Sequence, residues 1–178
     1  MKIAKHINTN SNYIYTIAEI GINHNGSLET ALSLIEQAHK AGVDAVKFQK
    51  RELEELYTGS ILADHNSAEW TFEYLLPILK ETELSKEDYE VIRNYCNELS
   101  IELIITPFDL NSADFCNELG VDAFKIGSAD MVNYELIERC ASFGKPLVIS
   151  TGMWTSAEIE EAVRKYGELG VTDFFILL

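Results

Sequence analysis

Short β-branched or aromatic runs alternate along the chain with longer segments whose apolar residues recur at helical spacing. The runs are typical of buried strands, and the longer segments, several of which end at a glycine, are typical of amphipathic helices. The predicted strands are Tyr13–Gly21, Asp44–Gln49, Ile101–Thr106, Asp122–Gly127, Pro146–Ser150 and a last strand that begins at Asp173. The predicted helices are Leu28–Gly42, Ser85–Ser100, Asn111–Leu119, Tyr134–Phe143 and Ser156–Leu169.

This strict alternation of strand and helix with short turns predicts an α/β fold, in which parallel strands are joined by right-handed crossovers. One segment breaks the rhythm. Residues 50–84 are acidic and too long for an ordinary strand-to-helix turn. We expect this connection to be a loop folded over one end of the sheet.

The number of strands relates the chain to a (β/α)₈ TIM barrel, which typically needs about 250 residues. Six predicted strands in 178 residues correspond to roughly the first five and a half of eight βα units. The chain stops inside an apolar run, TDFFILL. We therefore expect residues 1–178 to be an incomplete, N-terminal portion of a barrel. A complete doubly wound sheet of six strands is the alternative that periodicity leaves open.

Composition and charge narrow the class of protein. The chain is 47% hydrophobic and 24% charged, a balance that predicts a globular domain with a core. A net charge of −15 makes nucleic acid a poor partner. Cys96, Cys116 and Cys140 lie far apart in apolar segments, which favours buried thiols in a reducing compartment. The N-terminus has no signal-peptide pattern, and no apolar run approaches the roughly 18 residues that span a bilayer. We expect a cytoplasmic protein without a membrane partner.

Polar residues follow nearly every predicted strand, at the carboxyl ends where α/β folds gather their chemistry. They are Glu19, Lys47, Gln49, Thr106, Lys125, Ser128, Asp130 and Ser150.

Lys47 and Lys125 interrupt apolar strands, and an unpaired buried ammonium costs several kcal/mol. One interpretation is a structural network in which the lysines pair with Glu19 or Asp130. The other is a site where both lysines and nearby hydroxyls receive a small polyanion, such as a phosphate ester with a carboxylate. His24, in an NHNG turn, is more typical of a turn-stabilising side chain than of a metal ligand.

Five motifs in order resemble the sialic acid synthase family, whose members also include legionaminate, pseudaminate and spore-coat polysaccharide synthases. The motifs are AEIGINHNG (18–26), AVKFQ (45–49), TPFD (106–109), FKIGSAD (124–130) and ISTGM (149–153). The resemblance implies a TIM barrel that condenses phosphoenolpyruvate with a 2-acetamido aldose such as N-acetylmannosamine. The products would be a nine-carbon ulosonic acid and phosphate.

The resemblance also implies roles for the strand-end residues in binding phosphoenolpyruvate. Lys125, Ser128 and Ser150 match the family's site for the phosphate group. Lys47 and Thr106 match groups near the carboxylate of the same substrate.

Further matches concern the reacting carbonyl and the sugar. Glu19 matches an acidic residue beside the metal and the carbonyl, so Glu19 and Lys47 are the expected catalytic residues. Gln49 and Asp130 match positions that face the sugar. The family uses a divalent metal, usually manganese with magnesium as the alternative, to hold and polarise the aldehyde. Its two metal-binding histidines would lie beyond Leu178, so no metal ligand is expected within this chain.

The resemblance further implies a homodimer, in which a small C-terminal antifreeze-like domain, also expected beyond Leu178, reaches into the partner's active site. The isolated chain is therefore expected to be inactive. Two alternatives stay open: a non-catalytic truncated barrel completed by another polypeptide, and a phosphoenolpyruvate-dependent synthase of another sugar acid, such as an octulosonate-type enzyme.

Overall fold

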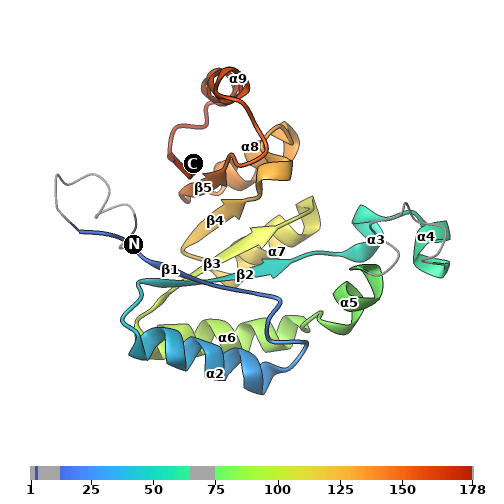
Figure 1. The fold of residues 1–178 in the computed structure, drawn as a ribbon, viewed down its shortest axis with the longest axis vertical. Helices are drawn as coiled ribbons and strands as arrows, with labels where there is room; N and C mark the ends of the chain where they lie inside the picture. Colours follow the sequence, from blue (N-terminus) through green and yellow to red (C-terminus); the bar gives the residue numbers. More distant parts are fainter. Residues whose placement is uncertain (1–2, 4–12, 65–74, 178) are drawn as a thin grey trace.

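The computed structural model of the protein describes residues 3, 13–64 and 75–177, and within them strands and helices alternate as predicted (Figure 1). The strands are β1 (Ile17–Gly21), β2 (Ala45–Lys50), β3 (Glu102–Pro107), β4 (Ala123–Ile126), β5 (Leu147–Ser150) and β6 (Phe174–Leu177). The helices that follow the predicted pattern are α2 (Leu28–Lys40), α6 (Lys86–Leu99), α7 (Leu110–Leu119), α8 (Tyr134–Ser142) and α9 (Ser156–Glu168).

The six strands form one sheet in the order β1-β2-β3-β4-β5-β6, and every neighbouring pair is parallel. A doubly wound sheet reverses its strand order at a switch point, whereas this order runs in sequence throughout. The doubly wound alternative is therefore wrong. The sheet is the consecutive parallel wall of a partial TIM barrel.

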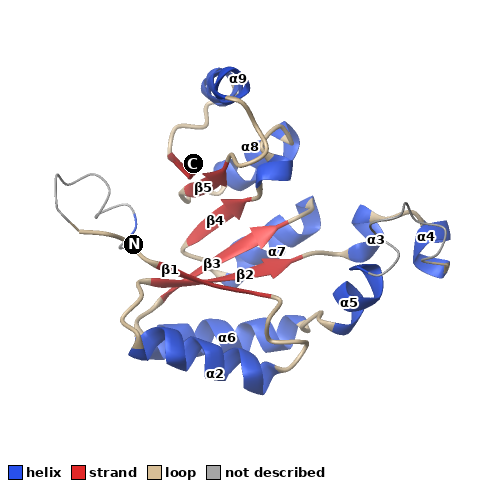
Figure 2. Cartoon of the chain, viewed as in Figure 1, coloured by secondary structure: helices blue, strands red, loops and turns tan. Residues whose placement is uncertain are grey.

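Side chains alternate between the two faces of each strand, and each face has its own apolar cluster. The larger cluster lies between the sheet and the helices and includes Phe48, Leu103, Phe124 and Ile149. A smaller cluster covers the opposite, inner face. Its buried members are Ile3, Ala45, Ile104, Ala123 and Val148. Figure 2 shows α2 and α6 packed along one side of the strands, so these helices do not cover the inner face of the barrel wall.

The helices begin where the sequence provides capping side chains. The Ser85 side chain accepts a hydrogen bond from the Asp88 backbone N–H while the Asp88 carboxylate accepts one from Ser85, a capping box at the start of α6. Thr155 and Glu158 form the same arrangement at the start of α9.

Two predictions are corrected in detail. Instead of a loop, residues 50–84 contain three short helices, α3 (Leu53–Leu56), α4 (Gly59–Ala63) and α5 (Leu75–Glu81), which gather beyond the carboxyl end of β2 in Figure 1. Residues 65–74 lie outside the described part. Leu76 and Leu79 of α5 are buried, whereas α3 and α4 have no buried residue.

The first strand is shorter than predicted: β1 begins at Ile17 rather than at Tyr13. Side-chain contacts add to the backbone hydrogen bonds that the Thr16 carbonyl accepts from Asp44 and Ala45. The Thr16 backbone N–H donates to Asp44 Oδ2 at 2.8 Å, and the Tyr15 hydroxyl donates to Glu102 Oε2 at 2.5 Å.

The three cysteines are buried free thiols, as predicted. Burial raises the pKa of Cys96 and Cys140 to about 12, so these thiols are protonated and chemically quiet at neutral pH. Among the helices that the structure describes, none is long and apolar enough to cross a membrane.

Candidate functional site

The polar residues predicted at the strand ends form one layer on the inner face of the barrel wall. In parallel strands, residues two apart share a face. The register pairs Glu19 with Lys47, but it places Lys47 beside Ile104 and Lys125 beside Val148, so this layer is staggered from strand to strand. Each member lies two residues after an apolar inner-face residue of its own strand: Glu19 after Ile17, Lys47 after Ala45, Thr106 after Ile104, Lys125 after Ala123 and Ser150 after Val148.

Lys47 joins three strands at the carboxyl end of the sheet. Its ammonium lies 2.8 Å from Glu19 Oε2 on β1 and 3.4 Å from Thr106 Oγ1 on β3. The pairing with Glu19 confirms part of the structural interpretation. However, the Glu19 side chain is 61% exposed while that of Lys47 is 7% exposed. The Glu19 carboxylate is therefore accessible to a ligand, whereas the Lys47 side chain is buried and is held by its contacts with Glu19 and Thr106.

Lys125 lies on β4 and, unlike Lys47, forms no ion pair within the described residues. Its side chain is buried, and its ammonium donates to the Ile126 carbonyl at 2.6 Å. Among the residues that the structure describes, no carboxylate forms an ion pair with it, so the predicted pairing with Asp130 is wrong. Burial and the charge of Lys47 lower the pKa of Lys125 to about 8, although the charges of Glu19 and Asp130 oppose this fall. A buried cation beside a second cation and without a direct ion pair is arranged to receive an anion.

Ser128 and Asp130 lie just beyond β4 in η2 (Ser128–Asp130), a single 3₁₀ turn. The Trp154 indole N–H donates to the Ser128 carbonyl at 2.5 Å and so ties this turn to the segment after β5. Burial raises the pKa of the Asp130 carboxyl. Sequence reasoning missed Trp154, because no local pattern indicates which carbonyl an indole reaches.

Gln49 continues the inner face of β2, and so does Arg51, which sequence reasoning missed. The Arg51 guanidinium donates to the Gln49 side-chain oxygen and stacks on Phe108, with Cζ 4.4 Å from the ring centroid. The alternation of Lys47, Gln49 and Arg51 at every second position was the signal that could have identified it.

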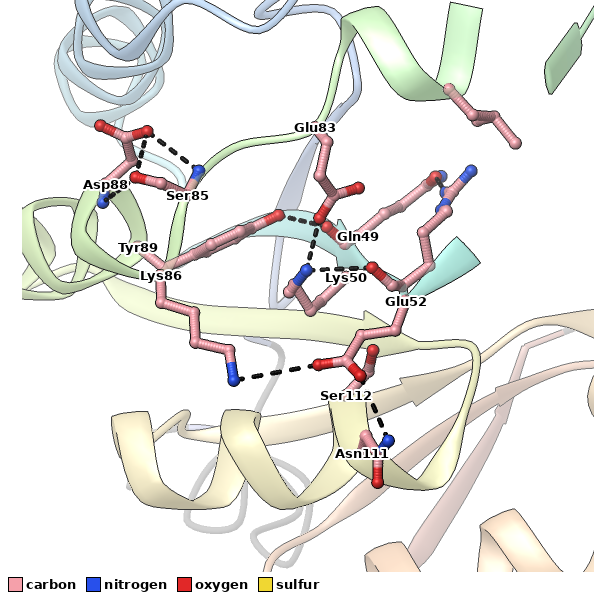
Figure 3. A network of polar contacts seen from close by, with 12 residues as sticks. Gln49, Lys50, Glu52, Glu83, Ser85, Lys86, Asp88, Tyr89, Asn111 and Ser112 are labelled. Carbon is pink, nitrogen blue, oxygen red and sulfur yellow. Dashed lines mark hydrogen bonds and ion pairs between the residues drawn. The ribbon is translucent and has the colours of Figure 1, made fainter. Parts of the chain in front are cut away.

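A polar network fixes the segment that follows β2 (Figure 3). Lys50 forms an ion pair with Glu83 and donates to the Arg51 carbonyl at 2.9 Å, while the Tyr89 hydroxyl donates to the Gln49 carbonyl. Asp109, of the TPFD motif, belongs to the same scaffold. Its carboxylate caps α7 and accepts the Glu52 backbone N–H at 2.8 Å. These contacts hold the end of β2 rigid beside the site.

A cleft of about 560 Å³ opens beside this layer. Gln49 and Asp130, both predicted to face a sugar, line it together with Arg51 and Phe108. Part of its wall is apolar. The apolar residues are Ile22, Leu56, Leu75, Leu79 and Ala129. Lys47 and Lys125 do not line the cleft. The site therefore has two parts, the layer that contains the lysines and an adjoining cleft with polar and apolar walls that is large enough for a monosaccharide.

His24 is a structural residue. It is buried and stacks on Phe48 with ring centroids 5.8 Å apart, and its Nδ1 accepts the Gly26 N–H at 3.2 Å. Burial lowers the pKa of His24, which favours the neutral ring. Within the described ranges, no group of three or more His, Cys, Asp or Glu side chains is placed to hold a metal ion.

Comparison with known proteins gives consistent matches. A family model described as the NeuB family matches residues 34–178. The N-acetylneuraminate-9-phosphate synthase of Drosophila melanogaster is 38% identical over 165 residues, which cover 92% of this chain and 44% of that protein. The N,N'-diacetyllegionaminic acid synthase of Legionella pneumophila is 37% identical over 171 residues, which cover 92% of this chain and 48% of that protein.

The fold is also similar to a solved structure, the N-acetylneuraminic acid synthetase of Leptospira borgpetersenii. The two share a TM-score of 0.78 and 30% identity, over 93% of this chain and 53% of that one. The chain thus spans about half the length of the curated relatives that it matches.

Proposed function

Because this chain belongs to the NeuB family, we propose that the complete protein condenses phosphoenolpyruvate with a 2-acetamido aldose. The products are a nine-carbon ulosonic acid and phosphate. The named relatives that support this proposal are synthases of N-acetylneuraminate 9-phosphate and diacetyllegionaminate. The chain supplies the phosphoenolpyruvate half of the site and part of the sugar cleft.

The observation that carries the proposal is the state of Lys125, a buried cation that has no carboxylate partner in the described part of the chain. Phosphoenolpyruvate carries a phosphate and a carboxylate within one small molecule. Lys125 with the Ser128 and Ser150 hydroxyls suits the phosphate, and Lys47 with Thr106 suits the carboxylate. An acidic protein that points two lysines at one place is suited to such a ligand.

The proposed reaction forms a carbon–carbon bond between the enol carbon of phosphoenolpyruvate and the aldehyde carbon of the sugar. Water then adds to the resulting oxocarbenium-like carbon, and phosphate leaves by cleavage of its C–O bond. Lys125 and Lys47 offset the negative charge that gathers on the departing phosphate and on the carboxylate. Glu19, exposed and adjacent to Lys47, is placed to accept or return a proton at the reacting carbonyl.

Phosphate release from phosphoenolpyruvate, measured with the protein made from its complete gene, tests this proposal. N-acetylmannosamine or another 2-acetamido aldose should support turnover, whereas a five-carbon sugar phosphate should not. Lys47→Ala and Lys125→Ala should each abolish turnover, while Lys165→Ala, an exposed lysine paired with Glu168, should leave it unchanged. Full activity in both site variants would contradict the assignment, and turnover with the pentose phosphate alone would favour an octulosonate-type enzyme.

Two parts of the proposal depend on the complete protein. We expect a divalent metal requirement, met by manganese or magnesium, which loss of activity on chelation and recovery on adding each ion back would test. We also expect a homodimer, which light scattering would identify. A monomer that is fully active after exhaustive chelation would contradict both expectations.

A further inference from the structure

Arg51 extends the inner face of β2 beyond the residues already assigned. It is 8% exposed, which is unusual for an arginine. Its guanidinium lies over Phe108, with Cζ 4.4 Å from the ring centroid, and its Nη2 donates to Gln49 Oε1. The aromatic ring fixes the plane of the guanidinium, because stacking and a directed hydrogen bond together leave it little freedom.

Within the described part of the chain, this guanidinium has hydrogen-bonding capacity that is not used. A guanidinium carries five N–H donors, and among the described residues its hydrogen bond goes to the Gln49 side-chain oxygen. Across residues 13–64 and 75–177, the Arg51 guanidinium forms no ion pair with a carboxylate. Burial lowers the pKa of Arg51, but the charges of Glu83 and Asp109 oppose this, so the group stays cationic at neutral pH.

Arg51, Gln49 and Asp130 all line the cleft of about 560 Å³. The Gln49 oxygen is occupied by Arg51, so the Gln49 amide NH₂ is left as a donor toward the cleft. Asp130 belongs to the same 3₁₀ turn as Ser128. The cleft therefore adjoins the proposed phosphate site, which is where the second substrate must lie for the carbon–carbon bond to form.

We propose that Arg51 is a binding residue for the acceptor sugar, which it contacts through its free guanidinium N–H groups while it fixes the orientation of Gln49. This inference rests on the proposed function, and it adds a specificity-determining residue to it. The ligand atoms are oxygens of the acceptor, whether hydroxyl, acetamido carbonyl or phosphate. Leu56, Leu75 and Leu79 supply apolar wall for the carbon-bound parts of the same sugar.

The test is steady-state kinetics of the complete protein carrying Arg51→Met, which keeps an apolar stem over Phe108 but removes every donor. The KM for the acceptor should rise about tenfold or more, because hydrogen bonds to a charged group are lost. The KM for phosphoenolpyruvate should change by less than about twofold. A matched control is Arg139→Met. Arg139 also stacks on a phenylalanine, Phe143, at 5.1 Å, but pairs with Asp114 on the helical surface, and its loss should change neither KM.

Unchanged acceptor KM in Arg51→Met, or equal rises in both KM values, would overturn the inference. If Arg51→Met does not fold, as judged by its thermal unfolding, two milder variants decide. Phe108→Leu keeps every polar group and should raise the acceptor KM alone by about two- to fivefold, since only the stacking is lost. Arg51→Lys should raise the acceptor KM by less than Arg51→Met does, because an ammonium keeps the charge but does not reproduce the planar set of guanidinium N–H donors.

The type of acceptor oxygen is resolved by repeating the comparison with the aldose and its 6-phosphate. A larger effect of Arg51→Met on the phosphorylated sugar assigns the guanidinium to the phosphate, and an equal effect assigns it to ring substituents. Failure of the proposed function is distinguishable, because the unaltered protein would then release no phosphate with any acceptor.

Discussion

Replacing Lys125 with methionine should leave the protein at least as stable while destroying its activity. Removing a lysine that stabilises the fold lowers the free energy of unfolding of the protein. A buried lysine that is kept for ligand binding destabilises the fold, so its removal does not lower that free energy. Lys125 has the features of the second kind. It is 7% exposed and has no carboxylate partner within the described residues, and its recorded hydrogen bond goes to the Ile126 carbonyl at 2.6 Å.

The magnitude follows from the pKa. A fall from 10.5 to about 8 corresponds to about 3 kcal/mol against the charged form, at about 1.36 kcal/mol per pKa unit. Water reaches part of the ammonium, so we discount this cost to about 1–2 kcal/mol. Methionine removes the cost but also forfeits one hydrogen bond worth about 1 kcal/mol. The net expectation for Lys125→Met is a free energy of unfolding that is equal or higher by up to about 1 kcal/mol.

Urea unfolding of the complete protein without substrate measures this difference. Lys50→Met provides the matched control, because Lys50 is equally buried at 5% exposure but pairs with Glu83. Its removal strands a carboxylate and should lower the free energy of unfolding by about 1–3 kcal/mol. In parallel, Lys125→Met should lower kcat/KM for phosphoenolpyruvate by about 100-fold or more, as loss of a charged contact to phosphate. A Lys125→Met protein that is destabilised as much as Lys50→Met and is still active would contradict the claim that Lys125 serves ligand binding rather than stability.

Three further predictions concern the same layer. Because Lys125 is charged below its pKa of about 8 and neutral above it, kcat/KM for phosphoenolpyruvate should fall as pH rises through about 8; Lys125→Arg should lack this fall if the lysine causes it. Glu19→Gln should reduce turnover at least tenfold yet change unfolding by less than about 1 kcal/mol, since the carboxylate is 61% exposed; a large loss of stability with normal turnover would make Glu19 structural. Trp154→Phe removes the donor to Ser128 and should raise the KM for phosphoenolpyruvate about three- to tenfold, whereas no change would show that the 3₁₀ turn holds without it.

The fold was predictable because its signals are local. Alternating strand and helix patterns, with caps such as Ser85 and stops such as Gly120, mark the elements, and parallel α/β rules then limit the topology. The order of the strands was not local information, so a doubly wound sheet stayed possible until the register was known. The helices within residues 50–84 were missed because they are short, with four, five and seven residues, so they show too little of the helical period to be recognised.

The site was predictable to the extent that strand ends converge. Glu19, Lys47, Thr106 and Lys125 share the inner layer because residues two apart share a face. Which lysine is paired was not predictable. Lys47 reaches Glu19 on the neighbouring strand, whereas within the described residues Lys125 donates to the Ile126 carbonyl. Arg51 escaped notice for a similar reason, since its role depends on Phe108, which is 57 positions away in the sequence and adjacent in space.

A crystal structure of the complete protein with phosphoenolpyruvate bound would show whether this layer is the substrate site. We predict phosphate oxygens at hydrogen-bonding distance, about 2.7–3.2 Å, from Lys125 Nζ and from the hydroxyls of Ser128 and Ser150. We also predict the carboxylate beside Lys47 and Thr106. Phosphoenolpyruvate bound elsewhere, or bound here with Lys125 turned away from the phosphate, would contradict the claim that this layer is the substrate site.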